Sequence, residues 1–104
     1  MNKNLSLKFN GEKVTIGENE YVASSLPIGK MKLMSAAFDP ENVSESEIFE
    51  NMIFFIHASL ARNHPDITTE LIEDNMTIPE ATELFEKIIL MSGASNNKKK
   101  VTMK

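Results

Sequence analysis

Apolar and polar residues alternate near the start of the chain, which is the pattern of a half-buried β-strand. Residues 5–9 (LSLKF) alternate, and residues 14–16 (VTI) do so again. Asn10 and Gly11 stand between these two runs. This pair is favoured in two-residue hairpin loops because both residues accept positive φ. The pattern therefore predicts a β-hairpin over residues 5–16, whose apolar face must pack on other elements because an isolated hairpin is barely stable in water.

Helical spacing follows after a connector. Glycine, serine and proline recur between residues 17 and 29, which favours a loop with at most a short extended piece. Met31, Met34 and Phe38 then recur at helical spacing and predict a helix over about 29–38. The pair Asp39-Pro40 ends it, because a residue before proline avoids the helical region.

The next segment has the clearest helix start in the chain. Ser44 and Glu47 have the spacing of a capping box, and a helix is expected over 44–63, before His64-Pro65. At 100° per residue, one arc of about 160° holds most of its large apolar side chains. They are Ile48, Phe49, Met52, Ile53, Phe55, Ile56 and Leu60. An arc of this width predicts the central helix of the core.

Two further helices complete the predicted fold. A short helix is expected over 67–76, and a second capping box at Thr77 and Glu80 begins a helix over 78–92. Residues 95–104 are polar and basic and are expected to form a flexible tail. The fold class predicted is α+β and mainly α, with an N-terminal β-hairpin packed on a small bundle of about four helices in a single domain, residues 1–94.

Charge divides the chain into three parts. Residues 1–32 carry a net charge of +2, residues 33–94 carry −10 (two cations against twelve acids), and residues 95–104 carry +4. Because such an acidic body repels phosphate, the folded part is not expected to bind nucleic acid, although the lysines of the tail could touch it. No apolar run is long enough for a membrane span, and no secretory leader is recognised, so a cytoplasmic location is expected.

The residues that could do chemistry do not form a recognisable group. Cysteine is absent. His57 and His64 lack a metal-ligand motif and are interpreted as boundary histidines with ordinary hydrogen-bond partners. Residues 39–50 have three acids at calcium-loop positions, but Val43 and Ser44 stand where a ligand and a glycine are needed. No catalytic, cofactor-binding or metal-binding residue is therefore predicted.

Surface for protein partners remains. Phe54 falls opposite the apolar arc of its helix, close to Ala58 and Ala61, and Leu90 is off-face on the last helix. These four residues are the predicted partner-binding set. Two interpretations of Phe54 stay open: the hairpin or the first helix covers it, or it is an exposed contact for another chain.

The order of these elements resembles a known family. The stretches 5–16, 27–38, 44–61 and 67–89 resemble the small tail assembly chaperones of long-tailed phages and prophages of Gram-positive bacteria. The resemblance implies a non-enzymatic protein that binds the tape-measure protein, keeps it soluble and helps to recruit subunits of the tail tube protein. It also implies a homo-oligomer in the cytoplasm of the bacterial host that is absent from the mature virion.

Two other classes remain as alternatives. One is a small helical protein-binding or regulatory module that self-associates. A DNA-contacting regulator would need a helix rich in lysine and arginine. The basic residues of the last three predicted helices are only two, Arg62 and Lys87. The other alternative is a structural tail-completion protein that stays in the particle.

Overall fold

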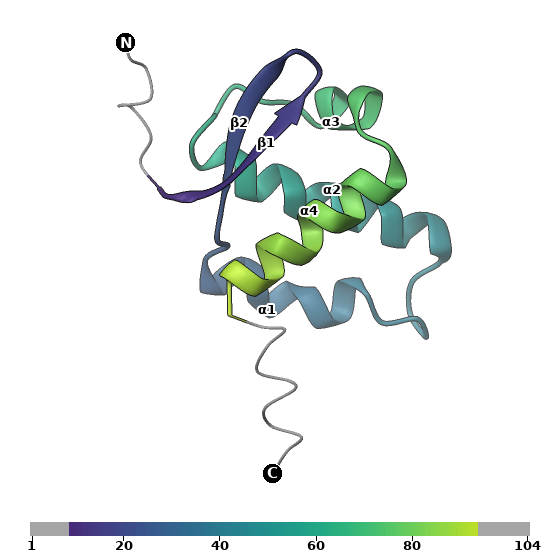
Figure 1. Ribbon diagram of the computed structural model, residues 1–104. Coiled ribbons are helices and arrows are strands. Elements are labelled where there is room, and N and C mark those ends of the chain that lie inside the picture. Colours follow the sequence, from purple (N-terminus) through teal and green to yellow (C-terminus); the bar gives the residue numbers. More distant parts are fainter. Residues whose placement is uncertain (1–8, 94–104) are drawn as a thin grey trace.

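The computed structural model describes residues 9–93, and these contain a two-stranded hairpin and four helices (Figure 1). The elements are β1 (Gly11–Ile16), β2 (Asn19–Ser24), α1 (Ile28–Ala37), α2 (Glu45–Ala61), α3 (Thr69–Asn75) and α4 (Ile78–Met91). The predicted fold class, a hairpin on a small helical bundle, is confirmed. The predicted strand at residues 5–8 and the predicted tail, 95–104, lie outside the described residues.

The hairpin is displaced along the sequence from its predicted position. Its strands are antiparallel, and Ile16 pairs with Asn19 across a two-residue loop, Gly17 and Glu18. Gly17 has φ of +66°, and no residue other than glycine has positive φ among residues 9–93. A positive φ at the first loop residue alone fits a type II′ turn, which continues the twist of the strands. The prediction of a turn at Asn10 and Gly11, followed by a connector over 17–29, is therefore wrong.

Gly11 has a different role, which explains the error. It lies at the start of β1, opposite Ser24. A β-carbon at Gly11 would overlap the carbonyl oxygen of Ala23. The residue thus allows a close approach of two backbones and does not form a turn. Glycine serves both purposes, so the sequence alone does not distinguish them.

Both predicted capping boxes are present. The hydroxyl of Ser44 accepts the Glu47 N–H at 3.2 Å, and Oε1 of Glu47 accepts the Ser44 N–H at 2.8 Å. Thr77 and Glu80 make the same pair of bonds at the start of α4. Each box satisfies two of the backbone donors that a helix start leaves free, which is why these boundaries were predictable from sequence.

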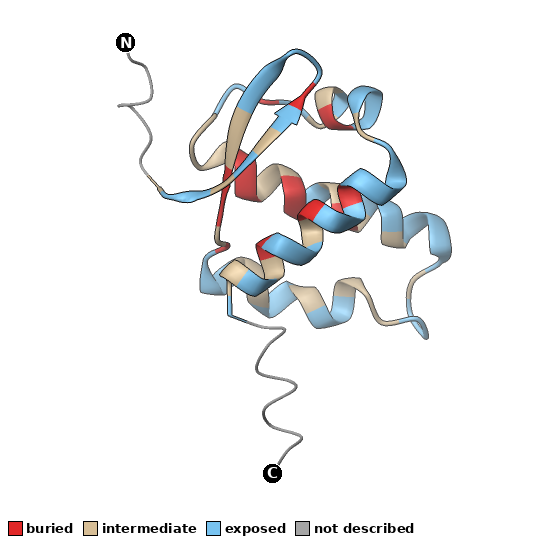
Figure 2. Cartoon of the chain, viewed as in Figure 1, coloured by how far each residue is buried: buried red, intermediate tan, exposed pale blue. Residues whose placement is uncertain are grey.

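The core lies around α2, which contacts β2, α1, α3 and α4 (Figure 2). Its buried apolar residues are Met52, Phe55, Ile56 and Leu60. Ile16 and Ala23 come to them from the hairpin, and Ile72, Leu84 and Ile88 from the last two helices. α2 is therefore the central element, as predicted.

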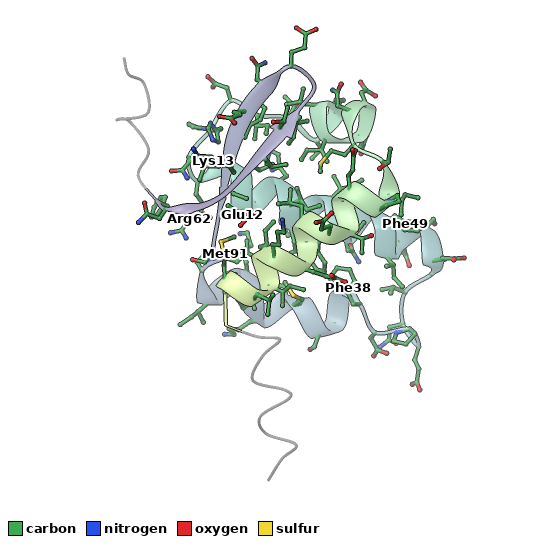
Figure 3. The ribbon with its side chains drawn as sticks, in the orientation of Figure 1. Glu12, Lys13, Phe38, Phe49, Arg62 and Met91 are labelled. Atoms are coloured by element: carbon green, nitrogen blue, oxygen red, sulfur yellow. The ribbon has the colours of Figure 1, made fainter. Side chains whose placement is uncertain are left out.

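Phe49 is a correction to the predicted arc of α2. Its side chain is 37% exposed, and the first buried residue of the helix is Met52. The first two turns of α2 are exposed or half-buried because the other described residues cover the helix only from its middle onwards (Figure 2). In Figure 3, Phe49 lies at the end of α2 opposite to Arg62.

Side chains from the end of α2 hold the hairpin. Asn63 accepts the Phe9 N–H at 2.9 Å and donates to the Phe9 carbonyl oxygen at 2.8 Å. Nε2 of His64 accepts the Val22 N–H at 2.9 Å, and Nδ2 of Asn63 lies 3.4 Å from the Val22 carbonyl oxygen. The two bonds at Val22 cap the edge of β2 that has no neighbouring strand, and they protect it there from pairing with another chain.

Candidate functional site

Phe54 lies in the middle of α2, on the side away from the core. Its side chain is 45% exposed, and Nζ of Lys30 in α1 lies 5.9 Å from the centre of its ring. Helix α1 therefore stands beside the ring but leaves nearly half of it open. The sequence left open whether Phe54 is covered or exposed. The first helix covers it only in part, and residues 5 and 7 of the predicted hairpin, which could also have covered it, lie outside the described residues.

Ala58 and Ala61 continue the surface from Phe54 along α2. They follow it by four and seven residues, which places them on the same side of the helix. Both are half-buried. With Phe54 they line a shallow cavity of about 370 Å³, here called the Phe54 groove. Its full lining is Pro27, Lys30, Phe54, His57, Ala58, Ala61 and Arg62. Three of the four predicted partner-binding residues thus meet in one groove.

The floor of the Phe54 groove is apolar and its edge is cationic. The guanidinium of Arg62 donates to the Ser25 carbonyl oxygen at 2.8 Å and lies 3.9 Å from the ring centre of Phe9. A guanidinium held on an aromatic face and by a carbonyl oxygen is restrained in position. Arg62 and Lys30 therefore give the groove a fixed positive border on an otherwise acidic protein.

Leu90 lies apart from this groove. It is on α4 and is 46% exposed, and it does not line the Phe54 groove. The structure thus separates the fourth predicted residue from the other three. A single exposed leucine on a helix is common on protein surfaces, so Leu90 alone gives little indication of a site.

Helix α1 has an exposed apolar surface that the sequence prediction missed. None of its residues is buried, and Ile28 and Leu33 are among the most exposed large apolar side chains of the described chain. The signal was available: apolar residues occur all round residues 28–37, so no polar face is left for solvent. Helix α1 packs on the core through half-buried Met31, Met34 and Ala37. Just after its end, Phe38 packs on Phe55 and Phe85, with ring centres 5.8 and 5.2 Å apart.

Both histidines have hydrogen-bond partners in the protein. Nε2 of His57 lies 2.9 Å from the carbonyl oxygen of Ile67. His64 accepts a backbone N–H through Nε2 and packs edge-on against Tyr21, with ring centres 5.0 Å apart. Burial lowers the pKa of His64 from its ordinary value, because a charged imidazolium loses hydration there. These contacts fit the predicted role of boundary histidines, and residues 9–93 contain no cluster of three or more His, Asp and Glu side chains able to hold a metal.

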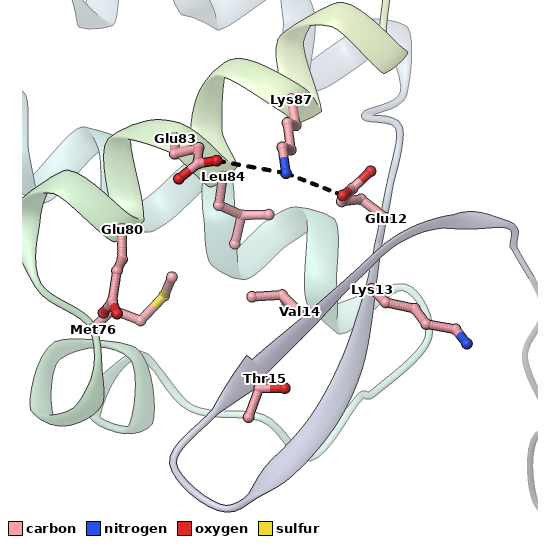
Figure 4. Close-up of a pocket in the computed structure, with 9 residues that line it drawn as sticks. All are labelled: Glu12, Lys13, Val14, Thr15, Met76, Glu80, Glu83, Leu84 and Lys87. Atoms are coloured by element: carbon pink, nitrogen blue, oxygen red, sulfur yellow. Dashed lines mark hydrogen bonds and ion pairs between the residues drawn. The ribbon is translucent and has the colours of Figure 1, made fainter.

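A cleft between β1 and α4 contains several charged side chains (Figure 4). Nζ of Lys87 lies 3.2 Å from Oε2 of Glu12 and 3.7 Å from Oε2 of Glu83. The hydrogen bond that Lys87 donates to Glu12, together with the charges of both carboxylates, raises the pKa of Lys87. The ammonium group is thus kept protonated, a state in which it is neither a nucleophile nor a base. The pair joins the hairpin to α4.

Among the described residues, no helix is both long enough and apolar enough to cross a membrane. Comparison of the chain with models of protein families, with curated proteins and with solved structures gives no match.

Proposed function

We propose that this protein is a phage tail assembly chaperone without enzymatic activity. In this role it binds the tape-measure protein through apolar helical surface, keeps it soluble and helps to recruit tail tube subunits in the cytoplasm of the bacterial host. The resemblance of the element order supports this proposal, and the Phe54 groove is the single structural observation that carries it. An aromatic ring beside two small residues offers a flat surface that another helix can approach closely.

This surface meets the physical requirements for binding a tape-measure protein. A tape-measure protein is a long helical chain whose apolar stripes are open to water before the tube assembles. A small protein can cover such stripes with an exposed groove and a half-packed helix, and the Phe54 groove and α1 are adjacent through Lys30 and Pro27. Many copies along one chain would add avidity.

The experiment is a pull-down of co-expressed tape-measure protein with the full chain and two variants. Phe54→Ser should reduce capture about tenfold or more, because aromatic anchors dominate the energy of interfaces. Phe49→Ser is the matched control, since it removes an exposed phenylalanine from the same helix, about 140° away around its axis. Both variants should remain folded and their melting curves should stay close to each other, because each loses a ring that is already partly in water.

Three outcomes would contradict the proposal. They are capture that Phe54→Ser leaves unchanged, equal loss in both variants, and no capture by the original chain. The alternative of a self-associating regulatory module predicts a different result. The original chain would not capture tape-measure protein, and Phe54→Ser would run smaller than the original chain on a sizing column. Recovery of the chain from purified particles by mass spectrometry would favour a tail-completion protein instead.

A further inference from the structure

A second apolar groove lies where α2, α3 and the start of α4 meet. Buried Met52, Ile72 and Ala81 contribute to its lining, and the exposed side chains of Phe49 and Ile78 border it. The cavity volume is about 230 Å³, which is several times the roughly 30 Å³ that a water molecule occupies in the liquid. We call it the Ile78 groove. It can accept apolar side chains of a partner.

The polar groups at its edge are few and are already used. Apart from Glu73 and Thr77, every residue that lines the groove is apolar. The backbone N–H and the hydroxyl of Thr77 are bonded to Glu80 in the capping box of α4. A partner would therefore gain from apolar contact in the groove and from charge around it, and not from hydrogen bonds to free donors.

The segment that supplies α3 and the start of α4 to this groove carries only negative charge. No lysine or arginine occurs between residues 63 and 86, whereas this segment contains seven acids. Four of them, Asp66, Glu70, Glu73 and Asp74, lie on or just before α3. Within residues 9–93 the ion pairs are those of Lys87 with Glu12 and Glu83. The carboxylates of α3 thus have no cation beside them in the described part of the chain.

We infer that the Ile78 groove binds a basic amphipathic helix of a partner protein. Apolar side chains on one face of that helix enter the groove, and lysine or arginine side chains flanking this face reach Glu73 and its neighbours. The Phe54 groove has the opposite border, formed by Lys30 and Arg62. The two grooves therefore select different segments, and this inference goes beyond the proposed function and does not depend on it.

The test uses the full chain and a labelled synthetic peptide of about 18 residues, or about five helical turns. The peptide carries leucines at helical spacing on one face and lysines along both sides of that face. A matched peptide carries glutamate in place of every lysine. Fluorescence anisotropy should show binding of the lysine peptide, about tenfold weaker binding of the glutamate peptide, and an affinity for the lysine peptide that falls as salt is added.

Variants locate the binding site. Ile78→Ser should weaken binding of the lysine peptide about tenfold without loss of folding, because the side chain is 57% exposed. Glu73→Lys should weaken the lysine peptide and strengthen the glutamate peptide, which a general loss of folding cannot do. Leu90→Ser is the matched control and should bind as the original chain does, because Leu90 is an exposed aliphatic side chain that lines neither groove.

Several results would overturn the inference. Equal binding of both peptides would exclude a role for charge. Undiminished binding of the lysine peptide by Ile78→Ser would exclude the Ile78 groove as the binding site. A loss in Leu90→Ser as large as in Ile78→Ser would show that the peptide binds elsewhere. Higher affinity for both peptides after Lys98, Lys99 and Lys100 are all changed to Glu would show that the chain's own lysines occupy the groove, in the same molecule or a second copy, because the added negative charge alone would weaken the glutamate peptide.

Discussion

Ser24 and Ser59 are two polar residues in the middle of the core, and they join β2 to α2. Both are almost completely buried. Oγ of Ser59 donates to the Ser24 carbonyl oxygen at 2.6 Å, and Oγ of Ser24 lies 3.2 Å from the Ser59 carbonyl oxygen. A buried carbonyl is stabilised by such a donor, and it is costly to leave without one. The pair therefore fixes where the strand crosses the helix.

Ser59→Ala tests this role. It removes the donor to the Ser24 carbonyl oxygen, so the free energy of unfolding should fall by about 1–3 kcal/mol. Chemical denaturation of the two proteins measures the difference. Ser35→Ala on the exposed side of α1 is the control and should change the value by less than about 0.5 kcal/mol. Equal effects of the two substitutions would show that the buried pair contributes little.

His64 gives the protein a predictable dependence on pH. Burial lowers its pKa in the folded state, so the unfolded chain binds a proton more readily. Stability should be complete above the ordinary value of about 6.5, should fall as the pH drops below it, and should level off below the lowered pKa. A protonated Nε2 also cannot accept the Val22 N–H.

Melting temperatures between pH 8 and pH 5.5 check this expectation. In His64→Gln the slope between these pH values should be shallower, because no group with a lowered pKa remains at that position. Ser35→Ala, which removes no titratable group, serves as the comparison and should keep the slope of the original chain. Parallel curves for the original chain and His64→Gln would contradict the assignment.

At the level of elements, α2 has two unequal halves. Its second half is buried among the hairpin and the other helices, and its first two turns are exposed or half-buried. Ile56 is fully buried, whereas Phe49 is 37% exposed. The same apolar periodicity runs through both halves, so the sequence pattern alone does not distinguish them.

Substitution by alanine should separate the two halves. Ile56→Ala leaves a cavity in a close-packed core and should cost about 2–5 kcal/mol. Phe49→Ala removes a ring that is already partly in water and should cost about 1 kcal/mol. Denaturant unfolding measures both values. Near-equal losses would mean that the first half of α2 is more closely packed than its exposure indicates.

The elements also show which kinds of information the sequence contains. Helix starts at Ser44 and Thr77 were predictable because a cap is a local bond between neighbouring residues. The position of the hairpin was not, because the need for glycine at residue 11 comes from Ala23 on the opposite strand. The same distinction holds at Phe54. The side of α2 that carries it was predictable from local helical spacing, but the groove between Phe54 and Lys30 was not, because it depends on where α1 packs.

At the scale of the whole molecule, two apolar grooves lie on different sides of α2 and have borders of opposite charge. Lys30 and Arg62 border the Phe54 groove, and Glu73 borders the Ile78 groove. Helix α2 contributes to the lining of both, so a partner at either groove contacts the central element directly. The net negative charge of the protein therefore does not indicate that one groove has a cationic border and the other an acidic border, which becomes visible in the folded structure.

The bonds that Asn63 and His64 make to the hairpin also set an order of events during synthesis. Phe9 and Asn63 are 54 positions apart, and Val22 and His64 are 42 apart. At about 5–20 residues per second, a ribosome needs about 2–8 s to add the 42 residues between the strand and its cap. For that time the nascent hairpin has an open edge. Charged Glu20 on β2 and Glu18 in the adjoining loop are exposed, and they oppose pairing of this edge with other nascent chains until residues 63 and 64 have been made.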